Sequence, residues 1–208
     1  MSPERNGLQT RKTSAVNEIS ENETFNDMLM PSPKLSWILG VLSGAGSVKP
    51  NHAISLESKR NPELLTEFSV VGQTLFGKQP HVAPNGIHFF SSRIAQELGD
   101  LRNEAWVETI QSRHKWILDN SDFIWKFIEG LFDTRAHLKT KPKYKENTLR
   151  FRTNNFTNAD FIKNRLLAVG IQKPTIFPDG EQPKETEYTV SVYNIKDLKI
   201  IADHIHPK

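Results

Sequence analysis

The sequence of 208 residues predicts an α+β fold built from two copies of one supersecondary unit. Two observations carry this prediction. Short apolar runs with an internal glycine occur twice, at 35–48 and 123–136, and pairs of strand-like segments alternate with helical ones after each run. Gly40 and Gly130 lie 90 residues apart, which sets the length of the repeat.

The first repeat is expected at 34–104, after a tail. Residues 1–33 are polar, lack periodicity and end in Pro-Ser-Pro, so we expect a flexible segment there. Asn61 and Pro62 are typical of a helix start, and Gly86 follows Pro-Asn in a predicted hairpin turn. Helices are predicted at 35–44, 62–76 and 92–101, and strands at 47–48, 53–58, 81–82 and 87–90.

The second repeat is expected at 105–208 and has the same order of elements. A helix at about 104–118 precedes the second glycine-containing helix, and Gly170 closes a later one. Further helices are predicted at 158–169 and 195–205, and strands at 136–145, 148–154, 175–177 and 188–192. The two repeats are expected to form one compact monomer with an internal pseudo-dimer.

The two glycine-containing helices are expected to pack against each other. A glycine inside a helix costs about 1 kcal/mol relative to alanine, and close approach of a second backbone offsets that cost. Small residues recur four apart on one face of each helix. The predicted helix-pair residues are Gly40, Gly44, Gly130 and Thr134.

Composition excludes several classes of protein. The chain has no cysteine, so disulfides and cysteine-based zinc sites are excluded. No apolar run reaches the roughly 20 residues of a membrane helix, and the N-terminus lacks the apolar core of a secretory signal. We therefore expect no membrane partner and an intracellular location, with the mitochondrion and the chloroplast among the compartments left open.

Positive charge is concentrated in the second repeat. The net charge is only +3, but residues 105–208 hold 17 basic against 13 acidic side chains. Between Arg135 and Arg152 there are seven cations and a single acid, Glu146. A local excess of this kind is typical of contact with a polyanion, more than the net charge alone would indicate.

The order of elements and two segments resemble the two-repeat LAGLIDADG homing endonuclease and maturase family over 34–208. The segments read Ile38-Leu-Gly-Val-Leu-Ser-Gly-Ala-Gly46 and Ile128-Glu-Gly-Leu-Phe-Asp-Thr-Arg-Ala136. The family positions that they keep are Gly40, Gly46, Gly130, Leu131 and Asp133. The resemblance implies a saddle of antiparallel strands for the DNA major groove, paired helices between the halves, and acids at the helix bases that bind divalent metals.

Both catalytic acids of that family are replaced here. Their positions hold Ala45, which has no ligand atom, and Arg135, a permanent cation that repels a metal. We therefore expect no catalytic residue, no cofactor and no metal site. In the alternative, Asp133 or Glu129 holds Mg²⁺ from a displaced position, and the chain is an active, site-specific DNA homing endonuclease.

The basic strands supply the candidate binding residues. Lys139, Lys141, Lys143 and Lys145 share one strand parity, and Arg150 and Arg152 alternate with apolar neighbours. The predicted nucleic-acid-binding residues are Arg135, Lys139, Lys141, Lys143, Lys145, Arg150, Arg152, Asn154, Asn155, Lys49 and Lys59. The two asparagines are included because amides pair with adenine. The plainer alternatives are a solvated, lysine-rich edge strand and, for Arg135, a surface arginine paired with Asp133.

The leading functional hypothesis is a nucleic-acid-binding pseudoenzyme on the LAGLIDADG fold. Its setting would be RNA splicing of introns, as in maturases, a ribonucleoprotein with other proteins, or DNA binding. RNA and double-stranded DNA both remain as partners, because backbone charge serves both. A third hypothesis, outside nucleic acids, is a scaffold whose saddle binds protein.

Overall fold

The structure is a computed structural model that describes residues 29–49, 53–59, 61–101, 105–141, 146–179 and 187–206. Contacts within the chain separate Met1–Met30 from a second unit, Pro31–Lys208, which contains both predicted repeats. The predicted tail lies outside the described residues up to residue 28, as do Lys143 and Lys145. Within the described ranges, no helix has the length and apolar character needed to cross a membrane.

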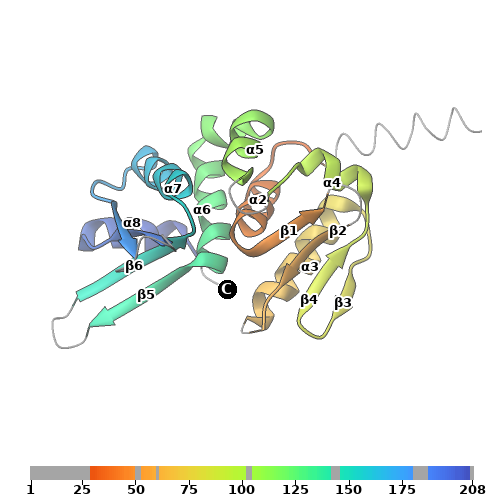
Figure 1. Ribbon diagram of the computed structural model, residues 1–208, viewed down its shortest axis with the longest axis horizontal. Helices are drawn as coiled ribbons and strands as arrows, with labels where there is room; N and C mark the ends of the chain where they lie inside the picture. The colour runs from red at the N-terminus through yellow and green to blue at the C-terminus, as the bar shows by residue number, and fades with distance from the viewer. Residues whose placement is uncertain are drawn as a thin grey trace, which may run out of the picture. The chain divides into compact units, whose positions relative to one another are not determined.

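Each repeat has the predicted order of elements (Figure 1). The first repeat consists of α2 (Pro33–Ala45), β1 (Gly46–Lys49), β2 (Ala53–Glu57), α3 (Pro62–Phe76), β3 (His81–Ala83), β4 (Gly86–Phe89) and α4 (Ser92–Leu98). The second consists of α6 (Ser121–Arg135), β5 (Ala136–Lys141), β6 (Glu146–Thr153), α7 (Phe156–Ala168), β7 (Thr175–Asp179), β8 (Glu187–Val192) and α8 (Ile195–His204). The connection contains α5 (Ala105–Arg113) and a 3₁₀ helix, η1 (Lys115–Asp119).

Helix α3 begins and ends where its local sequence predicts. The Asn61 side chain accepts a hydrogen bond from the backbone N–H of Leu64 at 3.0 Å, and Pro62 opens the first turn. Gly77 ends the helix with φ at 58°, a left-handed conformation that favours glycine. These signals act within a few residues, which is why the sequence alone places the boundaries well.

The helix predicted at 104–118 is two elements, and the single-helix prediction was wrong. Between α5 and η1 the chain turns at His114, which is 7% exposed, and whose Nε2 lies 3.0 Å from the Leu98 carbonyl oxygen. Burial lowers the pKa of the His114 imidazole, although the hydrogen bond to Leu98 acts in the opposite direction. A contact with a distant segment, invisible to helical periodicity, therefore accompanies the break.

The two repeats form sheets with the same number and order of strands. Each has four antiparallel strands, in the order β1-β2-β4-β3 in the first sheet and β5-β6-β8-β7 in the second. The registers correspond as well, because Ile54 pairs with Phe89 in the first sheet as Leu149 pairs with Val192 in the second. The predicted α+β arrangement of two related halves is confirmed.

Helices α2 and α6 lie side by side between the sheets (Figure 1). A Cβ atom added to Gly40 would lie 2.1 Å from the Phe127 carbonyl oxygen, and one added to Gly130 would lie 2.3 Å from the Trp37 carbonyl oxygen. No side chain fits at such distances. The backbones of the two helices can therefore touch at this level only because both positions are glycine.

Small and polar groups continue the contact toward both ends of the helix pair. At one end the Ser36 hydroxyl donates a hydrogen bond of 2.6 Å to the Phe123 carbonyl oxygen. At the other, a Cβ on Gly44 would lie 1.8 Å from Thr134 Oγ1. The helices thus remain close from their first turns to their last.

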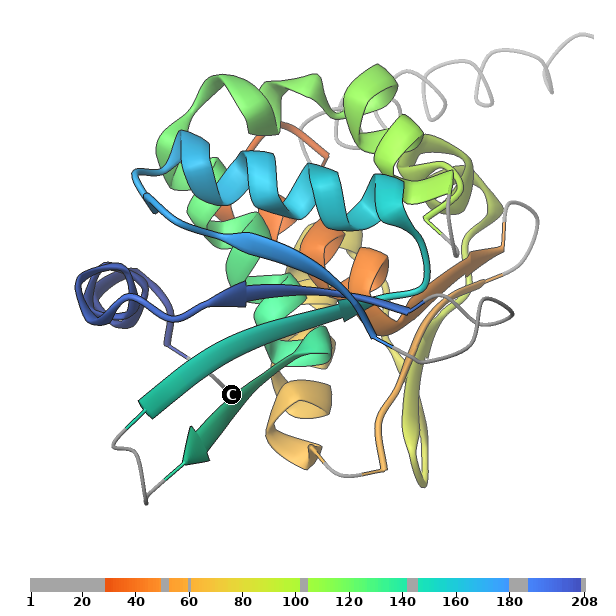
Figure 2. The ribbon, with the colours of Figure 1, turned by 60° about the vertical axis from the view of Figure 1, so that its left-hand side comes forward.

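Each sheet has an inner face that packs on helices and an opposite side, which we call the open face. In the first sheet, Ile54 and Leu56 point inward and are buried against α3 and α4, whereas Ser55 and Glu57 alternate with them on the open face. In the second sheet α7 covers the inner face and contacts β6, β7 and β8 (Figure 2). The two open faces are the surfaces that the fold leaves for polar side chains.

Candidate nucleic-acid interface

The open face of the second sheet carries arginines in alternation with core residues. On β6, Leu149 and Phe151 are buried, so Arg150 and Arg152 between and beside them project to the other side. Arg152 is exposed and Arg150 is half-buried. The alternation predicted from the sequence for this strand places both guanidinium groups on one surface.

The register of β5 adds a lysine to the same surface. Lys139 lies opposite Thr148, which has the strand parity of Arg150 and Arg152, and the Lys139 side chain is exposed. Lys141 continues this parity in the backbone of β5, and its side chain lies outside the described residues. The structure therefore brings together Lys139, Arg150 and Arg152 from two neighbouring strands.

Two buried polar atoms at the centre of this face lack partners. Arg150 lies opposite Ser191 of β8, and Ser191 is 1% exposed. Arg150 Nε and Ser191 Oγ have no hydrogen-bond partner in the described part of the chain. Buried donors without partners are uncommon in folded proteins and cost free energy. Both atoms are enclosed by the protein, so an external oxygen atom reaches neither of them unless the Arg150 side chain moves.

The predicted residues of the first repeat stay apart from this cluster. Lys49 ends β1 and Lys59 follows β2, and both side chains are exposed. They belong to the first sheet and its loop, on the other side of the helix pair from Arg150. The two halves thus hold unequal numbers of cations, as their sequences indicate.

The two asparagines predicted to read bases have roles in the turn between β6 and α7. Asn155 is the N-cap of α7, and its Oδ1 accepts a hydrogen bond of 2.7 Å from the Asn158 backbone N–H. Asn154 Oδ1 accepts a longer one, 3.5 Å, from Asn158 Nδ2. The structure thus gives Asn155 a capping role, and its part in base reading stays a prediction.

The last residues of the paired helices are a cation, Arg135, and an apolar residue, Ala45. Arg135, at the end of α6, donates a hydrogen bond from Nε to the carbonyl oxygen of Gly44, next to Ala45 at the end of α2. Partial burial lowers the pKa of the Arg135 guanidinium, and Glu187 acts in the opposite direction. A cation here also stabilises the last turn of α2, because helix C-termini carry partial negative charge.

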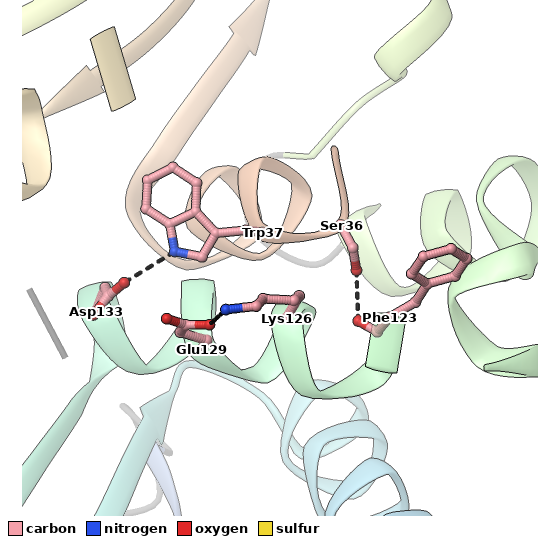
Figure 3. Close-up of polar contacts among 6 residues, drawn as sticks. All are labelled: Ser36, Trp37, Phe123, Lys126, Glu129 and Asp133. Atoms are coloured by element: carbon pink, nitrogen blue, oxygen red, sulfur yellow. Dashed lines mark hydrogen bonds and ion pairs between the residues drawn. The ribbon is translucent and has the colours of Figure 1, made fainter. Parts of the chain in front are cut away.

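The acids of α6 contact neighbouring side chains (Figure 3). Asp133 Oδ2 accepts a hydrogen bond of 3.0 Å from Trp37 Nε1 across the helix pair. Glu129 is 3% exposed, and its Oε2 lies 2.5 Å from Lys126 Nζ one turn earlier. Both carboxylates therefore have cationic or hydrogen-bonding partners within the helical layer.

The residues at the helix bases do not fit a divalent metal. Mg²⁺ and related ions take oxygen ligands, and Ala45 and Arg135 supply none. Among the described residues, no cluster of three or more His, Cys, Asp or Glu side chains is placed to hold a metal.

Sequence reasoning missed a cluster of rings on the open face of the first sheet. His81 of β3 lies opposite His88 of β4, and their ring centroids are 6.2 Å apart. Phe90 stands 6.4 Å from His88 with nearly parallel ring planes and 6.1 Å from His81. The alternation of His88 and Phe90 with buried Ile87 and Phe89 was a usable signal, but the place of His81 depends on strand register.

Comparison with protein-family profiles and with curated protein sequences finds no match. Solved structures do match. I-DmoI in complex with DNA and Mn gives a TM-score of 0.57 at 13% identity, over 85% of this chain and 98% of that one. Mesophilic variants of the homing endonuclease I-DmoI give 0.56 at 14% identity, over 83% and 95%. The N-terminal LAGLIDADG domain of DUF199/WhiA gives 0.53 at 14% identity, over 98% and 97%.

At these identities the likeness concerns the fold. It covers both repeats, the two four-stranded sheets and the helix pair between them. The unit Pro31–Lys208 therefore has the two-repeat LAGLIDADG fold, as the resemblance in its sequence predicts.

Proposed function

We propose that the chain binds nucleic acid along the open face of the second sheet and does not cleave it. The observation that carries the proposal is that Lys139, Arg150 and Arg152, from two neighbouring strands, share that one face. Lys139 and Arg152 lie on either side of Arg150 and add charge to the same surface.

The physical basis of the binding is phosphate neutralisation. Lysines and arginines that contact phosphates release condensed counterions, so affinity falls steeply as salt rises. Arginine also offers paired donors that match phosphate oxygens. Such contacts do not read sequence and serve DNA and RNA alike, so a DNA-binding role and a role in splicing or a ribonucleoprotein all require this surface. The fold likeness to I-DmoI, solved in complex with DNA, supports the proposal.

The chemistry at the helix bases supports the proposal that the chain does not cleave nucleic acid. Hydrolysis by two metals requires carboxylates that hold the ions next to the reacting phosphate. Ala45 and Arg135 occupy the corresponding positions, and the nearby acids Asp133 and Glu129 already contact Trp37 and Lys126. We expect plasmid DNA incubated with the protein and Mg²⁺ or Mn²⁺ to remain supercoiled, and any nicking would overturn this part of the proposal.

Binding is tested with labelled duplex DNA and a structured RNA at low salt. We expect Arg150→Ala with Arg152→Ala to weaken binding about a hundredfold, since each arginine makes a charged hydrogen bond. The matched control, Lys115→Ala with Lys163→Ala, removes the same charge from η1 and α7, away from the open face. No binding to either polymer, or equal losses in both double variants, would contradict the proposal.

A further inference from the structure

We infer that the open face of the first sheet is a stacking surface for unpaired bases, so that the protein prefers nucleic acid with a single-stranded or bulged segment. The inference deepens the proposed function and rests on it. Three rings carry the inference: His81, His88 and Phe90 are in mutual contact on one side of β3 and β4. No contact described above requires them.

The ring of Phe90 is largely exposed to solvent. Its side chain is 61% exposed, although Phe89 beside it is fully buried in the core. A large apolar ring in water gains free energy when a flat partner covers it. Phe89 already fills the core at this point of the strand, so the exposed Phe90 ring is available for an external partner.

Two of the three rings form a platform of nearly parallel rings, and the third, His81, is tilted by 46° and 55° against them. His88 and Phe90 have the same strand parity, and their planes differ by only 16°. Strand residues two apart are separated by about 6.7 Å. The His88 and Phe90 rings therefore lie next to each other along the strand, with nearly parallel planes. His81, from the next strand, borders both. Every nucleobase has a flat π-face, and stacking on aromatic side chains accepts any base sequence.

The charge of this face favours bases over the phosphates of a duplex. The side chains that share the face along β2 are Ser55 and Glu57, and Lys49 lies at its far end on β1. One acid and one lysine supply little attraction for a phosphate backbone. Bases inside a duplex are stacked on each other and present only their edges, so the platform can use its rings only on bases that are unpaired.

The equivalence of the two sheets in the repeat argues for the same ligand. The first sheet is the repeat-equivalent of the second, and its open face lies across the helix pair from Arg150 and Arg152. A nucleic acid held by its backbone on the second sheet can extend an unpaired segment over the rings. The occupant is therefore nucleic acid, with phosphates on one sheet and splayed bases on the other.

The test compares a fully paired DNA duplex with the same duplex carrying a short run of unpaired adenines. We expect the wild-type protein to bind the second about tenfold more tightly, since stacking on one aromatic side chain has about that effect. Phe90→Ala should remove the preference. Phe90→Trp, which keeps an aromatic ring at this position, should retain it. Phe156→Ala, which removes an exposed ring next to Tyr188 on the inner side of the second sheet, should leave the preference intact.

A fluorescent adenine analogue in the unpaired run gives a second readout. Stacking should quench its emission in the wild-type complex and not in the Phe90→Ala complex. The tenfold preference should also persist as salt rises, while both affinities fall. Equal affinity for the two ligands, or an unquenched analogue, would overturn this inference alone. No binding to either ligand would overturn the proposed function and the inference with it.

Discussion

The two sheets share strand order and register, yet their open faces carry different chemistry. Arg150 of the second sheet corresponds in register to Ser55 of the first, and Arg152 corresponds to Glu57. Two arginines in one half thus stand where the other half has a hydroxyl and an acid. The comparison shows that the repeat decides where a side chain projects, whereas the residue at that position decides what the surface binds.

The paired helices show a second difference between the halves. Helix α6 ends in Arg135, which donates to the Gly44 carbonyl oxygen, whereas α2 ends in Ala45, which has no polar atom in its side chain. Likewise Asp133 of α6 binds Trp37, while Ser43, its counterpart on α2, is buried without a hydrogen-bond partner among the described residues. Both helices supply polar groups to the contact, since Ser36 and Trp37 of α2 donate hydrogen bonds to α6, and Arg135 of α6 donates one to α2.

The largest expected effect comes from giving the second sheet the residues of the first. Arg150→Ser with Arg152→Glu removes two charged hydrogen bonds and adds an anion, so we expect duplex affinity to fall about a thousandfold at low salt. Fluorescence polarisation measures the loss. Lys115→Ser with Lys163→Glu makes the same change of charge elsewhere and should have little effect. A similar loss in that control would mean that net charge, and not this face, determines binding.

A substitution in the helix pair should weaken both halves together. Gly40→Ala places a Cβ against the Phe127 carbonyl oxygen, so α2 and α6 must separate, and we expect the free energy of unfolding to fall by about 3 kcal/mol. Urea denaturation measures the change. Gln73→Ala, at an exposed position of α3, should alter stability by less than about 0.5 kcal/mol. Equal stability of the Gly40→Ala variant would contradict the close approach of the helices.

The reciprocal exchange should give the first sheet a phosphate contact. Ser55→Arg with Glu57→Arg places two cations at the positions that Arg150 and Arg152 occupy in the other half. We expect duplex binding to tighten about tenfold and its salt dependence to steepen. Unchanged affinity would show that the first sheet does not reach the duplex.

The smallest effect concerns the pH dependence of stability through His114. Burial lowers the pKa of its imidazole below the ordinary 6.5, so the unfolded chain binds a proton more readily than the folded one. Its contribution to stability is complete above pH 6.5 and is lost as the pH falls below that value. His114→Gln should therefore reduce the drop in urea midpoint between neutral and mildly acidic buffer. An identical drop in both proteins would contradict this assignment.

Local signals explain how much of the fold the sequence predicts. The cap at Asn61 and the glycine at Gly77 act through nearby backbone, so the order of elements could be predicted. The pairing of α2 with α6 could be predicted because Gly40 and Gly130 recur 90 residues apart, each inside a helix. The break at His114 depends on Leu98, which lies 16 residues earlier in the chain. Periodicity within a segment does not contain such a contact.

Part of the candidate interface could also be predicted from the sequence. Strand alternation was enough to place Arg150 and Arg152 on one face, because it needs only the sequence of β6. Asn155 was predicted to contact bases, because asparagine suits base reading as well as helix capping; the structure shows the cap, and the base contact stays a prediction. The cluster around Phe90 required the pairing of β3 with β4, which the sequence does not specify by itself.

The most direct test of the account is the salt dependence of duplex binding. The logarithm of the association constant is plotted against the logarithm of salt concentration for the wild-type protein and for Arg150→Ala with Arg152→Ala. If these arginines contact phosphates, the slope of the double variant should be shallower by about two, one unit for each contact removed. Two parallel lines would show that the arginines contact no phosphate and would contradict the central claim.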